Sequence, residues 1–298
     1  MPLVIAAHAG HFGGMDKTLL SLGHGYSARA LAARLIPQGW RIIGTTRSRE
    51  KLDEIAATGV EPMLWPGSDL SSLLQEVPNL LVSAGPGPEG DPVLLDLQDE
   101  ITAAAPYLRW VGYLSTTGVY GDHGGDWVDE TTPLTPSTRR GAARVQAEAA
   151  WGAIPGLPLH IFRLAGIYGP GRGPFAKVRK GTARRIIKPG QVFSRIHVED
   201  IAQALDLSLA KPQPGAIYNL CDDDPAPPQD VIGHAAALLG LPLPPAVDFD
   251  KAEMTPMARS FYAESKKVRN DHAKAALGWQ PIYPDYRSGL AALLEAED

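Results

Sequence analysis

The chain has little cysteine, no long apolar run and no excess of basic residues. Its 298 residues include one cysteine, Cys221, so an internal disulfide framework is excluded and a cytoplasmic location is expected. The net charge of -5 and the pI near 5.9 argue against a general nucleic-acid-binding protein. The longest apolar runs fall far short of a membrane span, and we expect neither a membrane partner nor a metal site.

The opening segment, MPLVIAAHAGHFGG, does not fit the pattern that follows it. It is short and lacks the basic flank of a secretory signal, and the first predicted strand requires only Lys17 to Leu22. We therefore expect residues 1–14 to be an N-terminal extension, with Met15 as a possible start. Mass spectrometry of the native protein checks this, and a terminus at Met1 or Pro2 would contradict it.

Residues 19–48 predict a strand, a glycine turn, a helix and a second strand. Gly23, Gly25 and Ala28 have the spacing G-x-G-x-x-A between the apolar run LLSL and the helical pattern ALAARLIPQGW. The first glycine permits the tight turn, the second lets backbone amides approach a pyrophosphate at the helix N-terminus, and the alanine lets helix pack on strand. This context predicts a dinucleotide-binding unit rather than a purely structural turn.

The end of the second strand, WRIIGTTRS, indicates which dinucleotide binds. No Asp or Glu is present there to bind a ribose 2'-hydroxyl, whereas Thr45, Thr46, Arg47 and Ser48 offer hydroxyl groups and a guanidinium that suit a 2'-phosphate. We expect NADP rather than NAD. The alternative is that Arg47 lies in a solvated loop.

Short β-rich runs then alternate with helical patterns. The strand candidates are EPMLW, NLLVSAG, WVGYLST, LHIFRLAGIYG and AIYNL. This alternation predicts an α/β fold with a doubly wound parallel sheet. We assign residues 15–169 and 196–221 to an NADP-binding Rossmann domain, and 170–195 and 222–298 to a smaller, proline-rich substrate lobe.

Four ordered motifs carry a family resemblance: STTGVYG at 115–121, DETTPLTP at 129–136, RLAGIYGPGR at 163–172 and RIHVEDIA at 195–202. From Leu19 onward the chain resembles the extended and atypical short-chain dehydrogenase/reductases, a group of NAD(P)-dependent epimerase/dehydratase-like enzymes. The resemblance implies a Rossmann sheet of about seven strands with its site at the carboxyl edge. It also implies a homodimer built through two helices of the Rossmann domain. The implied cofactor contacts are Gly23, Gly25, Tyr26, Ser27, Ala28, Thr46, Arg47, Ser48, Ser83, Ala84, Gly85 and Arg144.

The chain departs from this family at the catalytic pair Tyr-x-x-x-Lys. With Glu148 setting the register, Arg140 stands at the tyrosine position and Arg144 at the lysine position. Arginine stays charged and cannot act as the acid or base. Because proton transfer by a positioned group contributes about 10²–10⁴-fold in rate, ordinary alcohol–ketone redox chemistry is expected to be impaired. Arg144 can still keep the lysine's contact with the nicotinamide ribose.

Other candidates accompany the two arginines. Thr116 matches the family's catalytic Ser/Thr position and can polarise a substrate carbonyl, or else it satisfies backbone groups at a strand end. We expect Tyr120, His123 and Tyr168 on loops at the edge of the site. Each could supply a replacement acid, or could have a purely structural role. His197 is a candidate base with a structural alternative, and Asp200 fits an N-cap. Sugar-nucleotide enzymes of this family often place a phosphate-binding arginine four residues before the histidine position. Arg195 stands only two residues before His197, so it matches that arginine with a shifted spacing.

The segment from Arg172 to Arg195 contains eight basic residues and no acid. Beside the site it would attract phosphate or carboxylate groups, so Tyr120, Tyr168, Arg172 and Arg195 are the expected substrate contacts; a solvated loop is the alternative. The sequence thus predicts an NADP-dependent oxidoreductase acting on an anionic molecule such as a nucleotide sugar. A non-catalytic NADP(H)-responsive regulator, and an isomerase or dehydratase with a cycling cofactor, remain as alternatives.

Overall fold

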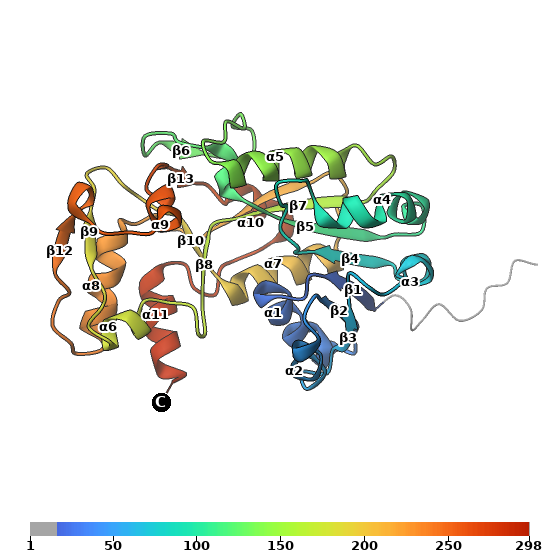
Figure 1. Cartoon of the computed structure of the whole chain (residues 1–298), viewed down its shortest axis with the longest axis horizontal. Helices are drawn as coiled ribbons and strands as arrows, with labels where there is room; N and C mark the ends of the chain where they lie inside the picture. Colours follow the sequence, from blue (N-terminus) through green and yellow to red (C-terminus); the bar gives the residue numbers. More distant parts are fainter. Residues whose placement is uncertain (1–16, 298) are drawn as a thin grey trace, which may run out of the picture.

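A computed structural model of the chain describes residues 17–297. Its centre is a seven-stranded, wholly parallel sheet with the order β11-β7-β5-β4-β1-β2-β3 (Figure 1). The strands are β1 (Thr18–Leu22), β2 (Arg41–Thr46), β3 (Glu61–Leu64), β4 (Asn79–Val82), β5 (Trp110–Thr116), β7 (Leu159–Leu164) and β11 (Ile217–Leu220). The order reverses beside β1, as in Rossmann folds. The predicted fold class and strand number are confirmed.

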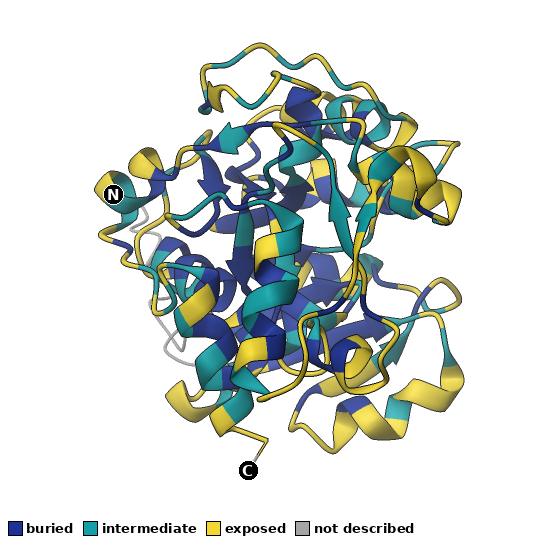
Figure 2. Cartoon of the chain, turned by 90° about the vertical axis from the view of Figure 1, so that its left-hand side faces the viewer, coloured by how far each residue is buried: buried dark blue, intermediate teal, exposed yellow. Residues whose placement is uncertain are grey.

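Helices cover both faces of this sheet because its strands are apolar on both sides. One face packs against α1 (Tyr26–Leu35), α2 (Leu52–Ala56), α7 (Val198–Ala210) and α10 (Asp271–Leu277). The other packs against α3 (Ser71–Glu76), α4 (Pro92–Ala104) and α5 (Arg139–Gly152). Figure 2 shows these strands as a dark blue interior behind helices whose outer surfaces are yellow.

A smaller lobe lies at one end of the sheet, on the left in Figure 1. It contains α6 (Phe175–Arg179), α8 (Pro228–Leu238), α9 (Pro256–Phe261), α11 (Tyr286–Glu295) and the paired strands β9 (Arg185–Ile187) and β12 (Ala246–Asp248). Two further parallel pairs join the parts: β8 (Gly166–Tyr168) with β10 (Arg195–His197), and β6 (Trp127–Val128) with β13 (Lys267–Val268).

The domain boundary differs from the sequence-based division in one segment. Val268, Ala273 and Trp279 were assigned to the lobe, but they pack in the core that α1 and α7 form on the sheet. The pairing of β13 with β6 draws this segment back to the main domain. The proposed extension, residues 1–14, lies outside the described residues. No helix in residues 17–297 combines the length and apolarity needed to cross a membrane.

Candidate functional site

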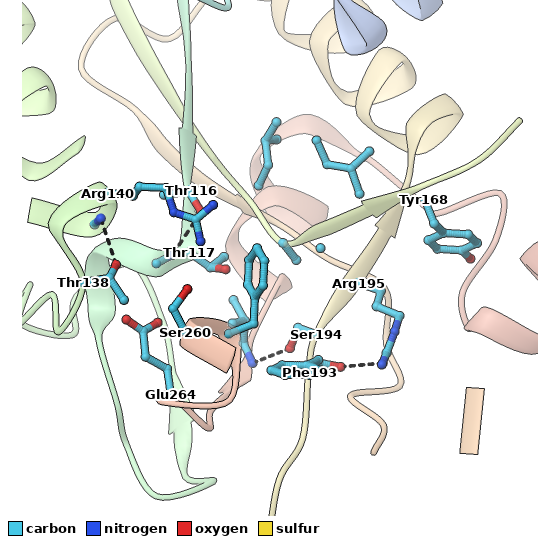
Figure 3. Close-up of a pocket in the computed structure, with 18 of the residues that line it drawn as sticks. Thr116, Thr117, Thr138, Arg140, Tyr168, Phe193, Ser194, Arg195, Ser260 and Glu264 are labelled. Atoms are coloured by element: carbon cyan, nitrogen blue, oxygen red, sulfur yellow. Dashed lines mark hydrogen bonds between the residues drawn. The ribbon is translucent and has the colours of Figure 1, made fainter. Parts of the chain in front are cut away.

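A cavity of about 1090 Å³ opens at the carboxyl ends of β1, β4 and β5, between the main domain and the lobe. Its walls come from the start of α1, the loop after β4, the end of β5, the first turns of α5, and several lobe segments. Figure 3 shows Thr116, Thr138 and Arg140 on one side and Tyr168 and Arg195 on the other. Ligands of open α/β sheets bind at this edge.

The glycine turn between β1 and α1 is held by its neighbours. Gly23 has φ +83°, and a Cβ there would lie 2.8 Å from the amide nitrogen of Ala84. The Thr45 hydroxyl accepts a hydrogen bond from the Gly23 amide at 2.8 Å. Thr45 therefore shapes the turn and is not a phosphate ligand, and Ala84 is a packing partner of Gly23.

No steric contact within the chain requires glycine at position 25. Its φ of -99° is ordinary, and a Cβ would meet nothing closer than the Gly23 carbonyl oxygen at 3.8 Å. The helix that follows has no side-chain N-cap bond and no acidic residue in its first turn, so its amides face the cavity side uncapped. These features fit the pyrophosphate of a dinucleotide, which needs close backbone approach and uncapped donors.

Half of the other ten predicted cofactor residues also reach the cavity. Tyr26, Ser27, Ser83, Gly85 and Arg144 line it. The Ser83 hydroxyl donates to the Gly23 carbonyl, so it braces the turn. Ala28, by contrast, is 2% exposed and packs in the core, as its predicted role in helix packing requires.

The cavity lining does not include the three predicted cofactor residues at and just beyond the end of β2, which are Thr46, Arg47 and Ser48. Arg47 is exposed and takes part in no ion pair among the described residues. The Thr46 hydroxyl accepts the Ser48 amide at 3.2 Å, and the Ser48 hydroxyl donates to Glu50. Of the three side chains, Arg47 is thus the one free to meet a cofactor phosphate.

The sequence motif did not single out His24, which lies between Gly23 and Gly25. It is 5% exposed, its Nδ1 lies 3.2 Å from the Ser21 hydroxyl oxygen, and its ring occupies the space beside Gly44 where a Cβ would be. Burial, helped by Arg29, lowers the pKa of His24 to about 4. The ring is therefore neutral and packs inside the main domain beneath the glycine turn, outside the cavity lining.

The three predicted catalytic residues meet in the cavity. Thr116 ends β5, and its hydroxyl oxygen accepts the Gly118 amide at 3.1 Å. Arg144 donates to the Leu114 carbonyl and, at 3.2 Å, to the Tyr113 hydroxyl. Arg140 lies one helical turn earlier, with its guanidinium carbon 4.7 Å from the ring centroid of Phe261. This part of the cavity wall thus carries two guanidinium groups and one hydroxyl.

A network of buried polar side chains holds α5, the helix that carries Arg140 and Arg144, against the sheet. Glu148 on α5 pairs with Arg163 on β7 at 2.7 Å, with both side chains about 5% exposed, and accepts the Ser115 hydroxyl at 2.5 Å. Arg163 also donates to the Tyr120 hydroxyl at 3.0 Å, and that hydroxyl donates to Asn219 at 2.7 Å.

Tyr120 therefore leaves the set of substrate contacts. Its side chain is 0% exposed and does not line the cavity, and burial raises its pKa to about 12. His123 is outside the lining too, and its Nε2 lies 3.1 Å from the Tyr120 carbonyl oxygen. Neither residue can reach a ligand in the cavity.

The remaining predicted substrate contacts, Tyr168, Arg172 and Arg195, line the cavity. Arg195 donates to the carbonyls of Phe193 and Ala226 at 2.8 and 3.0 Å, and burial raises the pKa of Tyr168 well above its usual range. The other basic residues between Arg172 and Arg195 do not line the cavity. Arg179 pairs with Glu297, for example, and Arg185 donates to the Pro244 carbonyl. The predicted positive field thus reduces to Arg172 and Arg195 at the cavity.

From His197 onward the RIHVEDIA segment is architectural, and the N-cap of its helix differs from the predicted one. His197, not Asp200, caps α7, accepting the Glu199 amide at 3.3 Å. Asp200 is 0% exposed inside the first turn, where its carboxylate accepts the amides of Ile282 and Tyr283. The predicted N-cap role of Asp200 is wrong, because this carboxylate anchors the chain that leads to α11.

Two lobe segments line the cavity without a sequence signal that identified them. One comprises Thr255, Met257, Ala258, Ser260, Phe261, Tyr262, Glu264 and Lys266; the other contributes Tyr286 and Leu290. Glu264 and Lys266 form an ion pair of 2.7 Å, about 10% exposed. Five basic side chains thus line the cavity against one acid, and that acid is already paired.

Comparison with known proteins adds a family. Residues 96–221 match the model of the NAD dependent epimerase/dehydratase family. The chain is 31% identical to protein YeeZ of Escherichia coli K12 over 289 residues, covering 90% of this chain and 97% of YeeZ. It is 29% identical over 177 residues to a 3-diazoavenalumate denitrifying reductase of Streptomyces, covering 55% of each.

A solved structure is also similar along nearly the whole chain. A conserved protein of unknown function from Silicibacter pomeroyi is 65% identical, with a TM-score of 0.91, and the match covers 94% of this chain and 99% of that one. The described arrangement of sheet and lobe is therefore shared with a close structural neighbour.

Proposed function

The chain belongs to the NAD-dependent epimerase/dehydratase family, and from that premise we propose that it binds a nicotinamide dinucleotide in the cavity and acts as an oxidoreductase or epimerase on a small anionic molecule. The observation that carries this proposal is Gly25, which the fold does not require to be glycine but a pyrophosphate does. The reductase among the relatives supports the oxidoreductase class.

The proposed cofactor is NADP. Arg47 supports this choice because it is exposed just beyond β2 and has no acidic partner among residues 17–297. A guanidinium there would form charge-assisted hydrogen bonds with a ribose 2'-phosphate. Tyr26, Ser27 and Gly85 would hold the dinucleotide, and Arg144 the nicotinamide ribose.

The charge of the cavity supports an anionic substrate. Arg140, Arg172 and Arg195 line the cavity without an ion pair among the described residues. Such a set attracts a phosphate or carboxylate, so a nucleotide sugar or another phosphorylated or carboxylated molecule is the proposed substrate class.

Bound nicotinamide supplies hydride transfer, and the protein must supply orientation and charge. Because the Thr116 oxygen accepts the Gly118 amide, its own hydrogen can be donated to a substrate carbonyl. Arg140 would stabilise the negative charge that develops on the substrate's carbonyl oxygen, as other fixed cations do. Tyr168 is a poor proton donor because burial raises its pKa, so we assign no general acid.

A second candidate function is an NADP(H)-responsive regulator without turnover. Arg140 and Arg144 support it, because guanidinium groups stay charged and leave both cavity positions without an acid or base. Such a protein would keep the cofactor site and lack an acid. We also propose a cytoplasmic homodimer; the exposed Leu95 on α4 is one apolar group that a partner could cover.

The test is a panel of anionic and neutral carbonyl compounds with NADPH, followed through nicotinamide absorbance for net reduction and through product analysis for epimerisation, which leaves the nicotinamide unchanged. The proposal predicts turnover with at least one anionic compound and none with neutral analogues of the same shape. Binding of NADPH with no turnover on any compound, together with NADPH-dependent association with another protein, would favour the regulator.

A further inference from the structure

A loop of the lobe reaches across the cavity to the start of α1. It comprises residues 169–173, with the sequence GPGRG, between β8 and α6. The hydroxyl of Tyr26, the first residue of α1, donates to the Pro170 carbonyl at 3.0 Å. The guanidinium carbon of Arg172 lies 5.5 Å from the centroid of the Tyr26 ring.

The loop has the conformation that this contact requires. Gly169 has φ +153°, and a Cβ there would lie 2.5 Å from the Tyr26 hydroxyl oxygen and 2.7 Å from Val198 Cγ1. Gly169 and Arg172 exchange two backbone hydrogen bonds of 2.9 Å. The loop is thus a closed turn seated against α1, and Arg172 is presented beside the helix start.

Positive charge therefore faces the same part of the cavity from two sides. On one side are the uncapped amides of α1, with the positive end of the helix dipole. On the other is Arg172, which is exposed and takes part in no ion pair among the described residues. The nearby Glu199 is engaged by the Tyr283 hydroxyl at 3.1 Å. An anion that lies between the two would be attracted by both.

We propose that Arg172 and Tyr26 form a clamp over the pyrophosphate of the dinucleotide. In this role Arg172 serves the cofactor, and Arg140 and Arg195 are left as the arginines that meet an anionic substrate. This inference rests on the proposed function, since Gly25 places the pyrophosphate at the start of α1. Tyr26 positions the loop, and Arg172 supplies the charge. Because the loop leads directly into α6, cofactor binding also fixes the first segment of the lobe.

The experiment titrates NADPH and NADH, at fixed salt, into the full-length wild type and into Arg172→Ala, Arg172→Lys and Tyr26→Phe. Lys180→Ala is the matched control, because it removes an exposed charge from the same segment outside the cavity lining. A charge-assisted contact predicts that Arg172→Ala weakens both dinucleotides by the same factor, about tenfold. Arg172→Lys should recover part of this loss, Tyr26→Phe should lose about threefold, and Lys180→Ala should match the wild type.

The outcomes separate this inference from the function on which it rests. If the wild type binds neither dinucleotide, the proposed function and the clamp both fall. If the wild type binds and Arg172→Ala binds equally well, the clamp alone is overturned. A loss confined to NADPH would overturn it too, because the pyrophosphate is common to both dinucleotides. Unchanged thermal unfolding of Arg172→Lys and Tyr26→Phe shows that losses in those variants do not come from misfolding.

Discussion

Arg140 and Phe261 meet at the cavity, with the guanidinium carbon of Arg140 4.7 Å from the ring centroid. Arg140 belongs to the first turn of α5, and Phe261 ends α9 with 52% of its surface exposed. A guanidinium stacked on a ring keeps its in-plane donors free. The contact therefore holds Arg140 in place while leaving its hydrogen-bonding edge for a ligand.

The first prediction concerns Arg140. Replacing it with alanine should lower kcat/KM for an anionic carbonyl substrate at least about tenfold, because a charge-assisted contact is lost. NADPH affinity should change less than about threefold, a loss expected only of weak neutral contacts. Steady-state kinetics and a binding titration measure the two. Arg139→Ala is the control, since Arg139 is the exposed neighbour outside the lining; an equal loss in both variants would contradict a specific role.

The second prediction concerns cofactor choice. Arg47→Glu should weaken NADPH more than about tenfold, because a carboxylate repels the 2'-phosphate, and should leave NADH within about threefold. Isothermal titration with both dinucleotides gives the ratio. Arg49→Glu makes the same charge change two residues farther on, at another exposed position. Equal weakening of NADPH and NADH by Arg47→Glu would remove this account of cofactor choice.

The third prediction concerns the buried pair of Glu148 and Arg163. Glu148→Ala leaves an uncompensated guanidinium in the core and should lower the unfolding free energy by about 3–5 kcal/mol. Glu61→Ala breaks an exposed pair with Arg41, in which both side chains are more than half exposed, and should cost less than about 1 kcal/mol. Urea unfolding compares them. Similar losses would mean that the buried pair does not hold α5 against the sheet.

The fourth prediction uses Asp200, whose pKa burial raises from 3.8 to about 7. Between these values the folded chain keeps a proton that the unfolded chain has lost, so the contribution of this carboxyl to the unfolding free energy falls as pH rises. Asp200→Asn cannot titrate. Relative to the wild type, it should gain more than about 1 kcal/mol between pH about 4 and about 7.

The control for this series is Glu199→Gln at the exposed neighbouring position. This variant keeps Asp200, so its unfolding free energy relative to the wild type, measured by denaturant unfolding at several pH values, should show no comparable gain as pH rises. A difference between Asp200→Asn and the wild type that stays constant with pH would show that Asp200 is ionised in the folded chain.

Much of the fold could be predicted from the sequence because its signals are local. The glycine turn and the alternation of strands and helices lie within short windows, and the structure contains each of the strands they predicted. Arg140 and Arg144 both reach the cavity because burial of Glu148 fixes which face of α5 meets the sheet. These signals require no knowledge of distant contacts.

The rest of the site depends on contacts between distant segments. Phe261 and Tyr262 reach the cavity because β13 pairs with β6 and because Lys188 donates to the Tyr262 carbonyl, and no local pattern announces either contact. Tyr120 has the same local context as an exposed loop tyrosine. Its hydroxyl is instead satisfied by Arg163 and Asn219, which are distant in the chain.

The central claim is that the cavity holds a dinucleotide against the start of α1, and Gly25→Ala tests it most directly. The folded chain has room for the added methyl group, whose nearest neighbour would be 3.8 Å away, so the unfolding midpoint should fall only by the small cost of alanine in place of glycine at an N-cap. Calorimetric titration should show NADPH binding to the wild type and at least about tenfold weaker binding to Gly25→Ala, because the methyl occupies the approach of the pyrophosphate. A wild type that binds neither NADPH nor NADH, or a Gly25→Ala variant that binds NADPH as well as the wild type, would contradict the claim.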